Sequence, residues 1–266
     1  MSKSKIEFLS IFQRLKNEGK LSSPRGQLVL EVENFNYELS PGVRFQNFKC
    51  RNFKLSYAKR EVLWYIVGNK FDTSICEHAK MWRSLVNADG SINSNYGQYV
   101  FSAQNQFDNV VKQLSSDKDS RRASIVILNK DHLFMETNDV PCTYSMNFRI
   151  RENKLNMSVM MRSQDAIFGM GNDAPAFSII HEMVLCALRE TYPTLEYGMY
   201  HHAANSFHCY ERHFKMLDEI CSGDAFEEVD CPQISGPEEV KYLRQNAHKL
   251  VDVPQEYKFS SWLGKV

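Results

Sequence analysis

The segment that most constrains the fold is residues 143–163, TYSMNFRIRENKLNMSVMMRS. Apolar and polar residues alternate in two runs that flank the turn-like triplet REN. Alternation with a period of two is typical of strands that bury one face, and a short polar turn between two such runs predicts a β-hairpin. A hairpin needs further elements to bury its apolar face, so we predict a chain built on a large sheet.

The rest of the chain mixes strand and helix patterns without a regular alternation or an internal repeat. Strands are expected in segments 26–39, 123–129 and 199–203. Helices are expected at 6–17, 57–68, 106–114, about 174–190 and 210–221, with a polar, irregular tail after them. The predicted class is α/β (α+β), a large mixed β-sheet flanked by helices. No linker-like stretch divides the chain, so we expect residues 1–266 to form a single domain.

The charge balance excludes some classes of partner. Lys and Arg number 32, and so do Asp and Glu, which leaves no net charge. We therefore expect no direct binding to nucleic acid or to an anionic membrane. The N-terminal stretch lacks an apolar run of signal-peptide length, and no segment approaches the roughly 20 apolar residues of a membrane helix. The protein is expected to be cytoplasmic.

The seven cysteines predict neither a disulfide framework nor a metal site. They stand at positions 50, 76, 142, 186, 209, 221 and 231, and no two form a CxxC pair. An odd number without zinc-ligand spacing is typical of free thiols, most of them buried. No metal is expected.

Cys142 follows Pro141 at the start of the hairpin and has two interpretations. It is either a small apolar filler or a nucleophile, and a nucleophilic thiol needs nearby cations to lower its pKa. Arg121, Arg122 and Arg162 could supply them, and planar guanidinium groups also suit a phosphate dianion. The adjacent arginines are equally compatible with a solvated turn.

Two acids flank a glycine-containing loop in RSQDAIFGMGND, residues 162–173. From the loop alone, helix capping is the favoured interpretation of Asp165 and Asp173, because Pro175 would then lie in the first turn of the next helix. His208 and Tyr210 alternate on one strand and could point into one cleft or be simply half-buried. GxGxxG, Walker and HExxH motifs are absent from the sequence, which argues against dinucleotide, nucleoside triphosphate and zinc-protease sites.

Taken in order, these motifs resemble the thymidylate synthase family from about Arg25 to Phe214. The resemblance implies a catalytic glutamate in REVLWYIVG, a tyrosine in NYG and a nucleophilic cysteine in PC, which are Glu61, Tyr96 and Cys142 here. It implies that the co-substrate is 5,10-methylenetetrahydrofolate. The residues expected at the folate site are Trp82 in MWRSL and, in RSQDAIFG, Asp165 and Gly169.

The same resemblance implies a nucleotide site that two subunits share. Arg25 of SSPRGQ, with Arg162 and Ser163, would hold the phosphate, and the HCY pair, His208 and Tyr210, the sugar hydroxyl. Arg121 and Arg122 of DSRR would reach the phosphate from the partner subunit of a homodimer packed sheet to sheet.

Three positions depart from ordinary members of the family. Those members carry PCH, a glutamine before RS, and an asparagine four residues after the loop glycine. This chain has Thr143, Met161 and Asp173 instead. Together with INSNYG, FGMGND and FHCYERHF, these departures resemble the dCMP hydroxymethylase branch known from T-even bacteriophages, viruses whose DNA carries modified cytosine. That origin would place the protein in a host cytoplasm.

Asp173 fits cytosine chemically. Uracil offers a carbonyl acceptor and a ring N–H donor, which a neutral amide can match. Cytosine reverses this pattern, because its amine donates and its ring nitrogen accepts. A carboxyl group at position 173 can accept from the amine and share a proton with the ring nitrogen.

The resemblance implies covalent catalysis. Cys142, assisted by the arginines, would add to carbon 6 of the pyrimidine, and carbon 5 would then attack the folate methylene. Water positioned by Glu61 would complete 5-hydroxymethyl-dCMP. Alternatives are a thymidylate synthase acting on dUMP, a dCMP methylase that uses hydride, a CMP enzyme, and an inactive relative that only binds nucleotide or a partner.

Overall fold

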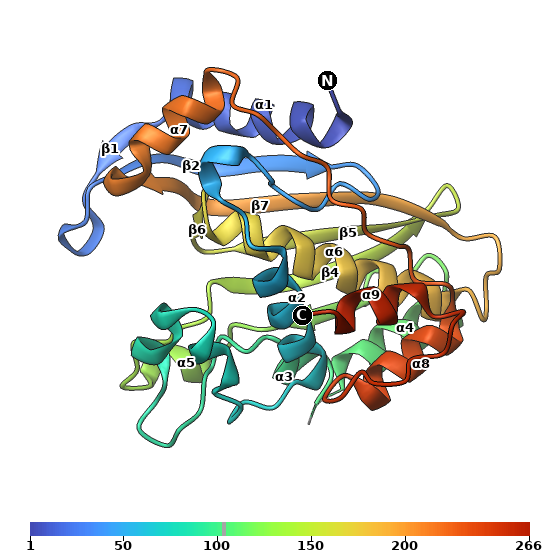
Figure 1. The fold of residues 1–266 in the computed structure, drawn as a ribbon. Coiled ribbons are helices and arrows are strands. Elements are labelled where there is room, and N and C mark those ends of the chain that lie inside the picture. Colours follow the sequence, from blue (N-terminus) through green and yellow to red (C-terminus); the bar gives the residue numbers. More distant parts are fainter. Residues whose placement is uncertain (103–104) are drawn as a thin grey trace.

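The computed structural model describes residues 1–102 and 105–266, and these residues form a seven-stranded sheet with helices around it (Figure 1). The strand order is β1-β2-β7-β5-β4-β3, and β6 pairs with β7 beside this path. The strands are β1 (Lys20–Ser22), β2 (Val29–Leu39), β3 (Ser124–Val126), β4 (Thr143–Arg151), β5 (Lys154–Met161), β6 (Gln164–Asp165) and β7 (Glu196–Tyr210).

The sheet is mixed, as predicted. β5 and β6 run parallel to β7, whereas the other described pairs are antiparallel. The predicted hairpin is confirmed as β4 and β5, which pair from Thr143 opposite Met161 to Arg151 opposite Lys154. Its turn consists of Glu152 and Asn153, both with positive φ (50° and 58°). Two left-handed residues in a two-residue turn match the right-handed twist of the flanking strands.

The alternation in the hairpin separates a buried face from an open one. Met146, Phe148 and Val159 are almost fully buried, and they belong to the large core cluster. Val126 of β3 and Met160 of β5 are about half exposed in the single chain, at 50% and 47%. The sheet therefore has one face against the helices and another that carries exposed apolar side chains.

The long helix α6 lies beside the sheet, with α1 and α7 at the edge formed by β1 and β2, and α2, α8 and α9 on the opposite side of α6 (Figure 1). Within the described part of the chain, no helix is both long and apolar enough to cross a membrane. The helices are α1 (Lys3–Glu18), α2 (Leu55–Val67), α3 (Gly97–Val100), α4 (Gln106–Ser116), α5 (Lys130–Phe134), α6 (Gly169–Leu188), α7 (Phe214–Cys221), α8 (Pro237–Asn246) and α9 (Lys258–Gly264).

Two expectations about the helices are wrong. The helix expected at about 174–190 begins at Gly169, with Phe168 at the N-cap position. Just before this start, the Asp165 carboxylate accepts hydrogen bonds from the backbone N–H groups of Ile167 (3.2 Å) and Phe168 (3.0 Å) and holds the turn that leads into the helix. Asp173 therefore lies inside α6 and does not cap it. The tail expected to be irregular contains α8 and α9.

The other predicted elements are confirmed with shifted ends. The strand expected at 199–203 is part of the fifteen-residue β7. The expected helix at 210–221 starts as strand, passes through a short 3₁₀ turn at Glu211–His213 and becomes α7. Gly68 ends α2 in the left-handed conformation (φ 63°), and its N–H bonds the carbonyl of Trp64.

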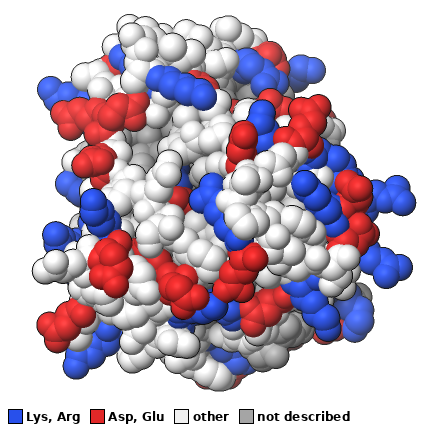
Figure 2. Space-filling view, turned by 90° about the vertical axis from the view of Figure 1, so that its right-hand side faces the viewer, with Lys and Arg blue, Asp and Glu red and all other residues white. Residues whose placement is uncertain are grey.

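Positive and negative side chains are mixed on the face of the molecule that Figure 2 shows. Figure 2 shows Lys and Arg interspersed with Asp and Glu over that face. The two signs are equal in number in the sequence. This face therefore offers no extended region of one sign.

Candidate active site

A pocket of about 520 Å³ brings together most of the predicted site residues. Its walls come from α2, the segment 80–96, Cys142 just before β4, the end of β5 with β6, the first turns of α6 and the end of β7. The predicted residues that line it are Glu61, Trp82, Tyr96, Cys142, Ser163, Asp165, Gly169, Asp173, His208 and Tyr210.

Helix α2 forms one wall through residues four apart in sequence. Tyr57, Glu61 and Tyr65 stand on one face of the helix, since residues i and i+4 are neighbours on a helical surface. The Tyr65 hydroxyl lies 3.5 Å from Glu61 Oε1, and Glu61 Oε2 is buried without a hydrogen-bond partner among the described residues. The protein thus leaves one hydrogen-bonding position of this carboxyl group unused at the pocket wall.

Cys142 lies between Tyr96 and Arg162. Its backbone N–H donates to the Tyr96 hydroxyl (3.2 Å), and its carbonyl accepts from the Arg162 backbone N–H (2.8 Å). Burial raises the pKa of the Cys142 thiol, and Arg162 and Arg25 oppose this rise without reversing it. Arg162 and Arg25 thus lower the thiol pKa as expected, but within the single chain burial outweighs them.

Arg162 supports the segment before the cysteine. Its guanidinium donates to the carbonyls of Val140 (2.8 Å) and Pro141 (3.0 Å). Arg162 and Arg25 also line an adjoining hollow of about 690 Å³, which meets the first pocket at Leu85. Two of the predicted phosphate ligands thus lie next to the pocket that holds Cys142.

Arg121 and Arg122 are not brought into this site by their own chain. Both are exposed just before β3, and neither lines the pocket of Cys142 nor the adjoining hollow. Their action across a subunit interface stays a prediction.

Glu61 and Asp173 form a coupled pair of acids. Burial, followed by the nearby charge of Asp173, raises the pKa of Glu61 to about 8. Burial is also the main cause that raises the pKa of Asp173 to about 7, and Asp165 adds to it. Asp173 thus loses its proton first, and its charge then delays the ionisation of Glu61.

The loop between the two aspartates is tightly packed. Asp165 uses its carboxylate to hold the N-terminus of α6, and a Cβ built on Gly169 would lie 3.3 Å from the Asp165 Cβ. Arg51, which is buried, binds the carbonyl of Ile167 (2.8 Å) and the side chain of Asn172 (3.1 Å). These contacts fix the direction in which α6 presents Asp173.

Aromatic side chains close two sides of the pocket. Trp82 Nε1 donates to the Tyr57 hydroxyl (2.9 Å). On β7, His208 and Tyr210 pack edge to face with ring centroids 5.0 Å apart, which confirms that they share one strand face. Burial lowers the pKa of His208, so its imidazole is neutral near pH 7 and can accept or donate a hydrogen bond.

Several residues that line the pocket were not predicted from the sequence: Tyr57, Tyr65, Gln164, Phe168, Arg212 and His213. The helical spacing of Tyr57 and Tyr65 from Glu61 was a usable signal for the first two. Of the departures from the family pattern, Met161 and Asp173 line the pocket. Thr143 is fully buried beside Cys142.

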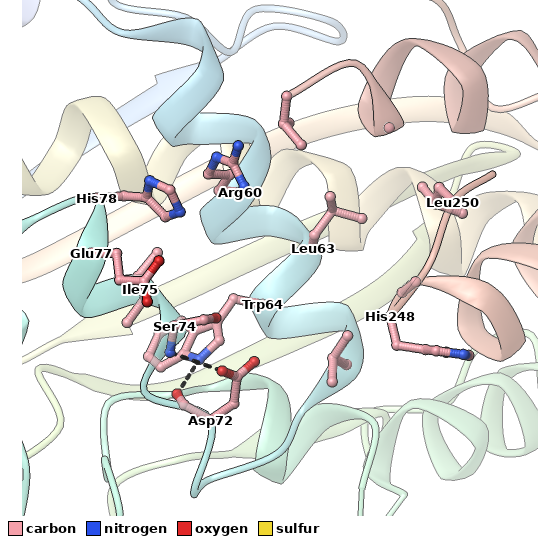
Figure 3. Close-up of a pocket in the computed structure, with 14 residues that line it drawn as sticks. Arg60, Leu63, Trp64, Asp72, Ser74, Ile75, Glu77, His78, His248 and Leu250 are labelled. Carbon is pink, nitrogen blue, oxygen red and sulfur yellow. Dashed lines mark hydrogen bonds between the residues drawn. The ribbon is translucent and has the colours of Figure 1, made fainter.

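A second pocket, of about 410 Å³, lies behind α2 and shares no residue with the first (Figure 3). Trp64 stands between them, and its Nε1 donates to the carbonyl of Asp72 (2.8 Å). Arg60, Glu77 and His248 also line this pocket, and none of the predicted site residues does. The candidate active site is therefore the pocket of Cys142.

Comparison with known proteins defines the class and then the family. The thymidylate synthase family model matches residues 7–253, which identifies the protein as a one-carbon transferase acting on a pyrimidine deoxynucleotide. The chain belongs to the thymidylate synthase family.

Its relatives include enzymes that are named for different reactions. The deoxycytidylate 5-hydroxymethyltransferase of Enterobacteria phage T6 is 33% identical over 172 residues, which is 61% of this chain and 70% of that protein. The deoxyuridylate hydroxymethyltransferase of Bacillus phage SP01 is 26% identical over 219 residues (76% and 56%). The thymidylate synthase of Fusobacterium nucleatum is 27% identical over 171 residues (62% and 59%).

Proposed function

We propose that this protein is a deoxycytidylate 5-hydroxymethyltransferase, which converts dCMP and 5,10-methylenetetrahydrofolate into 5-hydroxymethyl-dCMP and tetrahydrofolate. The observation that carries the proposal is Asp173, a carboxyl group in the pocket of Cys142 where the family resemblance expects an asparagine. The relative from phage T6 bears the same activity in its name.

The pKa of Asp173, raised to about 7, suits cytosine recognition. At neutral pH the group exists both with and without its proton. It can therefore accept a hydrogen bond from the exocyclic amine and donate one to the ring nitrogen. When the thiolate adds to carbon 6, the ring nitrogen gains electron density, and the Asp173 proton stabilises it.

The reaction begins with covalent addition at Cys142. Its sulfur forms a bond to carbon 6, and the displaced electron pair makes carbon 5 nucleophilic. Carbon 5 then bonds the methylene carbon of the folate. Loss of the carbon 5 proton, with cleavage of the bond between the methylene and the folate nitrogen, leaves an exocyclic methylene on the ring.

Glu61 directs water to that methylene. The support for this role is the buried Oε2, which has no partner among the described residues, and the hydroxyls of Tyr57 and Tyr65 on the same helix face. Addition of water and loss of its proton give the hydroxymethyl group. Departure of the Cys142 sulfur restores the double bond between carbons 5 and 6.

The nucleotide phosphate binds next to the cysteine. Arg25, Arg162 and Ser163 form its site within one chain, and the family resemblance adds Arg121 and Arg122 from the partner of a homodimer. Support for a sheet-to-sheet dimer comes from the open sheet face, where Val126 and Met160 are half exposed.

The folate lies against the aromatic side of the pocket. The family uses methylenetetrahydrofolate, and Trp82 with the exposed ring of Phe168 offers apolar surface for a flat heterocycle. Asp165 and Gly169 complete this wall. His208 and Tyr210 face the sugar hydroxyl.

The experiment uses purified protein with methylenetetrahydrofolate and either dCMP or dUMP tritiated at carbon 5. Tritium release is followed, and the product is identified by mass. Release from dCMP with formation of 5-hydroxymethyl-dCMP and tetrahydrofolate is the expected result.

The second candidate is an enzyme that acts on dUMP, which the names of the relatives from phage SP01 and Fusobacterium nucleatum favour. Tritium release from dUMP alone would establish this candidate and overturn the proposal. Formation of 5-methyl-dCMP with dihydrofolate would retain the role of Asp173 and reject the entry of water.

A further inference from the structure

Gln164 is a buried residue that contacts Asp173 and has no role in the function proposed above. It lies in β6, one residue before Asp165, with 2% of its surface exposed. Its side-chain Nε2 donates to Asp173 Oδ2 (3.1 Å), and its Oε1 accepts from the Tyr37 hydroxyl (3.1 Å). The amide thus joins the acid to a tyrosine of β2.

Tyr37 is itself held in place by the sheet. It pairs with His202 across β2 and β7, and the two rings stack with centroids 4.6 Å apart and an interplanar angle of 8°. Burial raises the pKa of the Tyr37 hydroxyl far above its ordinary value, so the group keeps its proton. A fixed hydroxyl that donates to Gln164 Oε1 turns the Nε2 of the same amide toward Asp173.

We propose that Gln164 is a positioning residue for Asp173, oriented by Tyr37, which keeps Oδ2 a hydrogen-bond acceptor and confines the exchangeable proton to Oδ1. This inference rests on the proposed function of Asp173 in pyrimidine recognition. Oδ1 then faces the ring nitrogen, and Oδ2 faces the substituent at carbon 4.

This arrangement discriminates between the two pyrimidines. Cytosine needs a proton donor at its ring nitrogen and an acceptor at its amine, which Oδ1–H and Oδ2 provide. Uracil needs a donor at carbon 4, hence a proton on Oδ2. That proton would point at the Nε2–H of Gln164, so that two donors face each other. The buried Nε2–H would then lose Oδ2 as its acceptor, which costs binding free energy.

Among the charged groups around Asp173, Asp165 of β6 raises its pKa, so the contribution of Gln164 must be separated from that of Asp165. The charge of Asp173 in turn raises the pKa of titratable groups on α2, β2 and β7, before α3 and before β4. These groups are Glu61, Tyr57, Tyr65, Tyr37, Tyr200, Tyr96 and Cys142.

The first test measures the Asp173 pKa in the ligand-free protein by ¹³C NMR of carboxyl-labelled aspartate, with the resonance identified by its absence in Asp173→Asn. In Gln164→Met the pKa should rise by about one unit, because a charge-assisted hydrogen bond to the ionised form is lost. Tyr37→Phe should raise the Asp173 pKa by a smaller amount. This second variant replaces Gln164→Met in the test if Gln164→Met does not fold. An unchanged or lowered pKa in both variants would overturn the inference.

Gln46→Met is the matched control. Gln46 is another fully buried amide, and its Nε2 binds the Ala166 carbonyl (3.0 Å) two residues from Gln164. This variant should lose stability while the Asp173 pKa stays in place. A shift as large as that of Gln164→Met would show a general packing effect and overturn the inference.

The second test measures kcat/KM for dCMP and dUMP. In Gln164→Met the preference for dCMP over dUMP should fall about tenfold, which corresponds to the free energy of one lost hydrogen bond. The pH profile of kcat/KM for dCMP should also shift to higher pH. An unchanged preference would show that Gln164 only fills space. A wild-type enzyme specific for dUMP would refute the proposed function, whereas the NMR titration needs no substrate and still tests the hydrogen bond.

Discussion

Glu61 and Asp173 make the stability of this protein depend on pH. Their folded-state pKa values, about 8 and about 7, lie above the ordinary values of 4.5 and 3.8. At pH values between the ordinary and the raised pKa of each group, the folded chain binds more protons than the unfolded chain. The free energy of unfolding therefore falls as pH rises through this range. This is the reverse of the trend caused by carboxylates in salt bridges.

The expected loss between pH 5 and pH 8 is on the order of 6 kcal/mol from these two groups together, with the larger part from Glu61. Urea unfolding of the ligand-free protein across this range measures it. Glu61→Gln should flatten the dependence and be more stable than wild type at pH 8. An equally steep fall in Glu61→Gln would mean that Glu61 ionises normally in the folded protein.

In the proposed mechanism, the covalent reaction depends on Cys142. Cys142→Ser should lower turnover by about 10⁴-fold or more, because a serine hydroxyl is a far weaker nucleophile near pH 7. It should also fail to form an adduct with 5-fluoro-dCMP and methylenetetrahydrofolate, which intact-protein mass spectrometry detects. Cys221→Ser should leave turnover and adduct formation unaffected. This control changes a partly exposed thiol of α7. Adduct formation by Cys142→Ser would place the nucleophile elsewhere.

The sequence predicts the lining residues of the pocket better than it predicts their chemistry. Cys142, Glu61 and Asp173 stand in recognisable motifs, and the structure brings them together. The net rise of the Cys142 pKa in the single chain could not be predicted, because it depends on how deeply the fold buries the thiol. Gln164 could not be foreseen, since its partner Tyr37 is 127 residues away and meets it only through the order of β2, β7 and β6.

Helix α2 carries one wall of the site, and a glycine sets its distance from α3. A Cβ on Gly97 would overlap the backbone oxygen of Tyr65. Gly97→Ala should therefore move α3 away from α2, lower the free energy of unfolding by about 3 kcal/mol and reduce activity by displacing Tyr65 and Tyr96. Thermal unfolding and kcat measure the two effects.

Gly90→Ala is the control at the level of elements. Gly90 has a positive φ (83°), but nothing lies within 4 Å of a Cβ at that position. Its replacement should cost about 1 kcal/mol from backbone strain alone. If Gly97→Ala and Gly90→Ala lost equal free energy of unfolding, the close approach of α2 and α3 would be refuted.

At the level of elements, patterns with a clear period were predicted well. The hairpin was predicted because the alternating residues and the turn residues indicate the same structure. In the structure β4 and β5 pair around this turn. The start of α6 was missed because its first turn precedes the apolar run, and Phe168 at the N-cap position has no capping side chain to mark it. Helix α8 was missed although Pro237, Glu238 and Glu239 in its first turn are a recognised start signal.

At the scale of the whole molecule, the C-terminal segment is tied to the helices that form the site. Glu182 of α6 forms a buried ion pair with Arg44 and accepts from the backbone N–H of Ile234 (2.9 Å). Lys59 of α2 donates to the carbonyl of Trp262 in α9 (2.5 Å). The segment after β7 therefore packs against both helices that carry the acids of the pocket.

The proposed dimer predicts complementation between defective subunits. A chain with Cys142→Ser, mixed with a chain carrying both Arg121→Ala and Arg122→Ala, should regain about a quarter of wild-type activity after subunit exchange, because half of the dimers then hold one intact site. Mixing Cys142→Ser with Glu61→Gln is the control and should restore nothing, since both residues belong to the same chain's pocket. Absence of recovery in the first mixture would place the arginines outside the site.

The central claim is that Asp173 makes this enzyme choose cytosine. It is tested by direct competition, in which equal amounts of dCMP and dUMP are offered with methylenetetrahydrofolate to wild type and to Asp173→Asn, and both products are quantified by mass. Wild type should prefer dCMP by about 100-fold or more, and Asp173→Asn should reverse the preference, because a neutral amide matches uracil. A wild-type preference for dUMP, or an unaltered preference in Asp173→Asn, would contradict the claim.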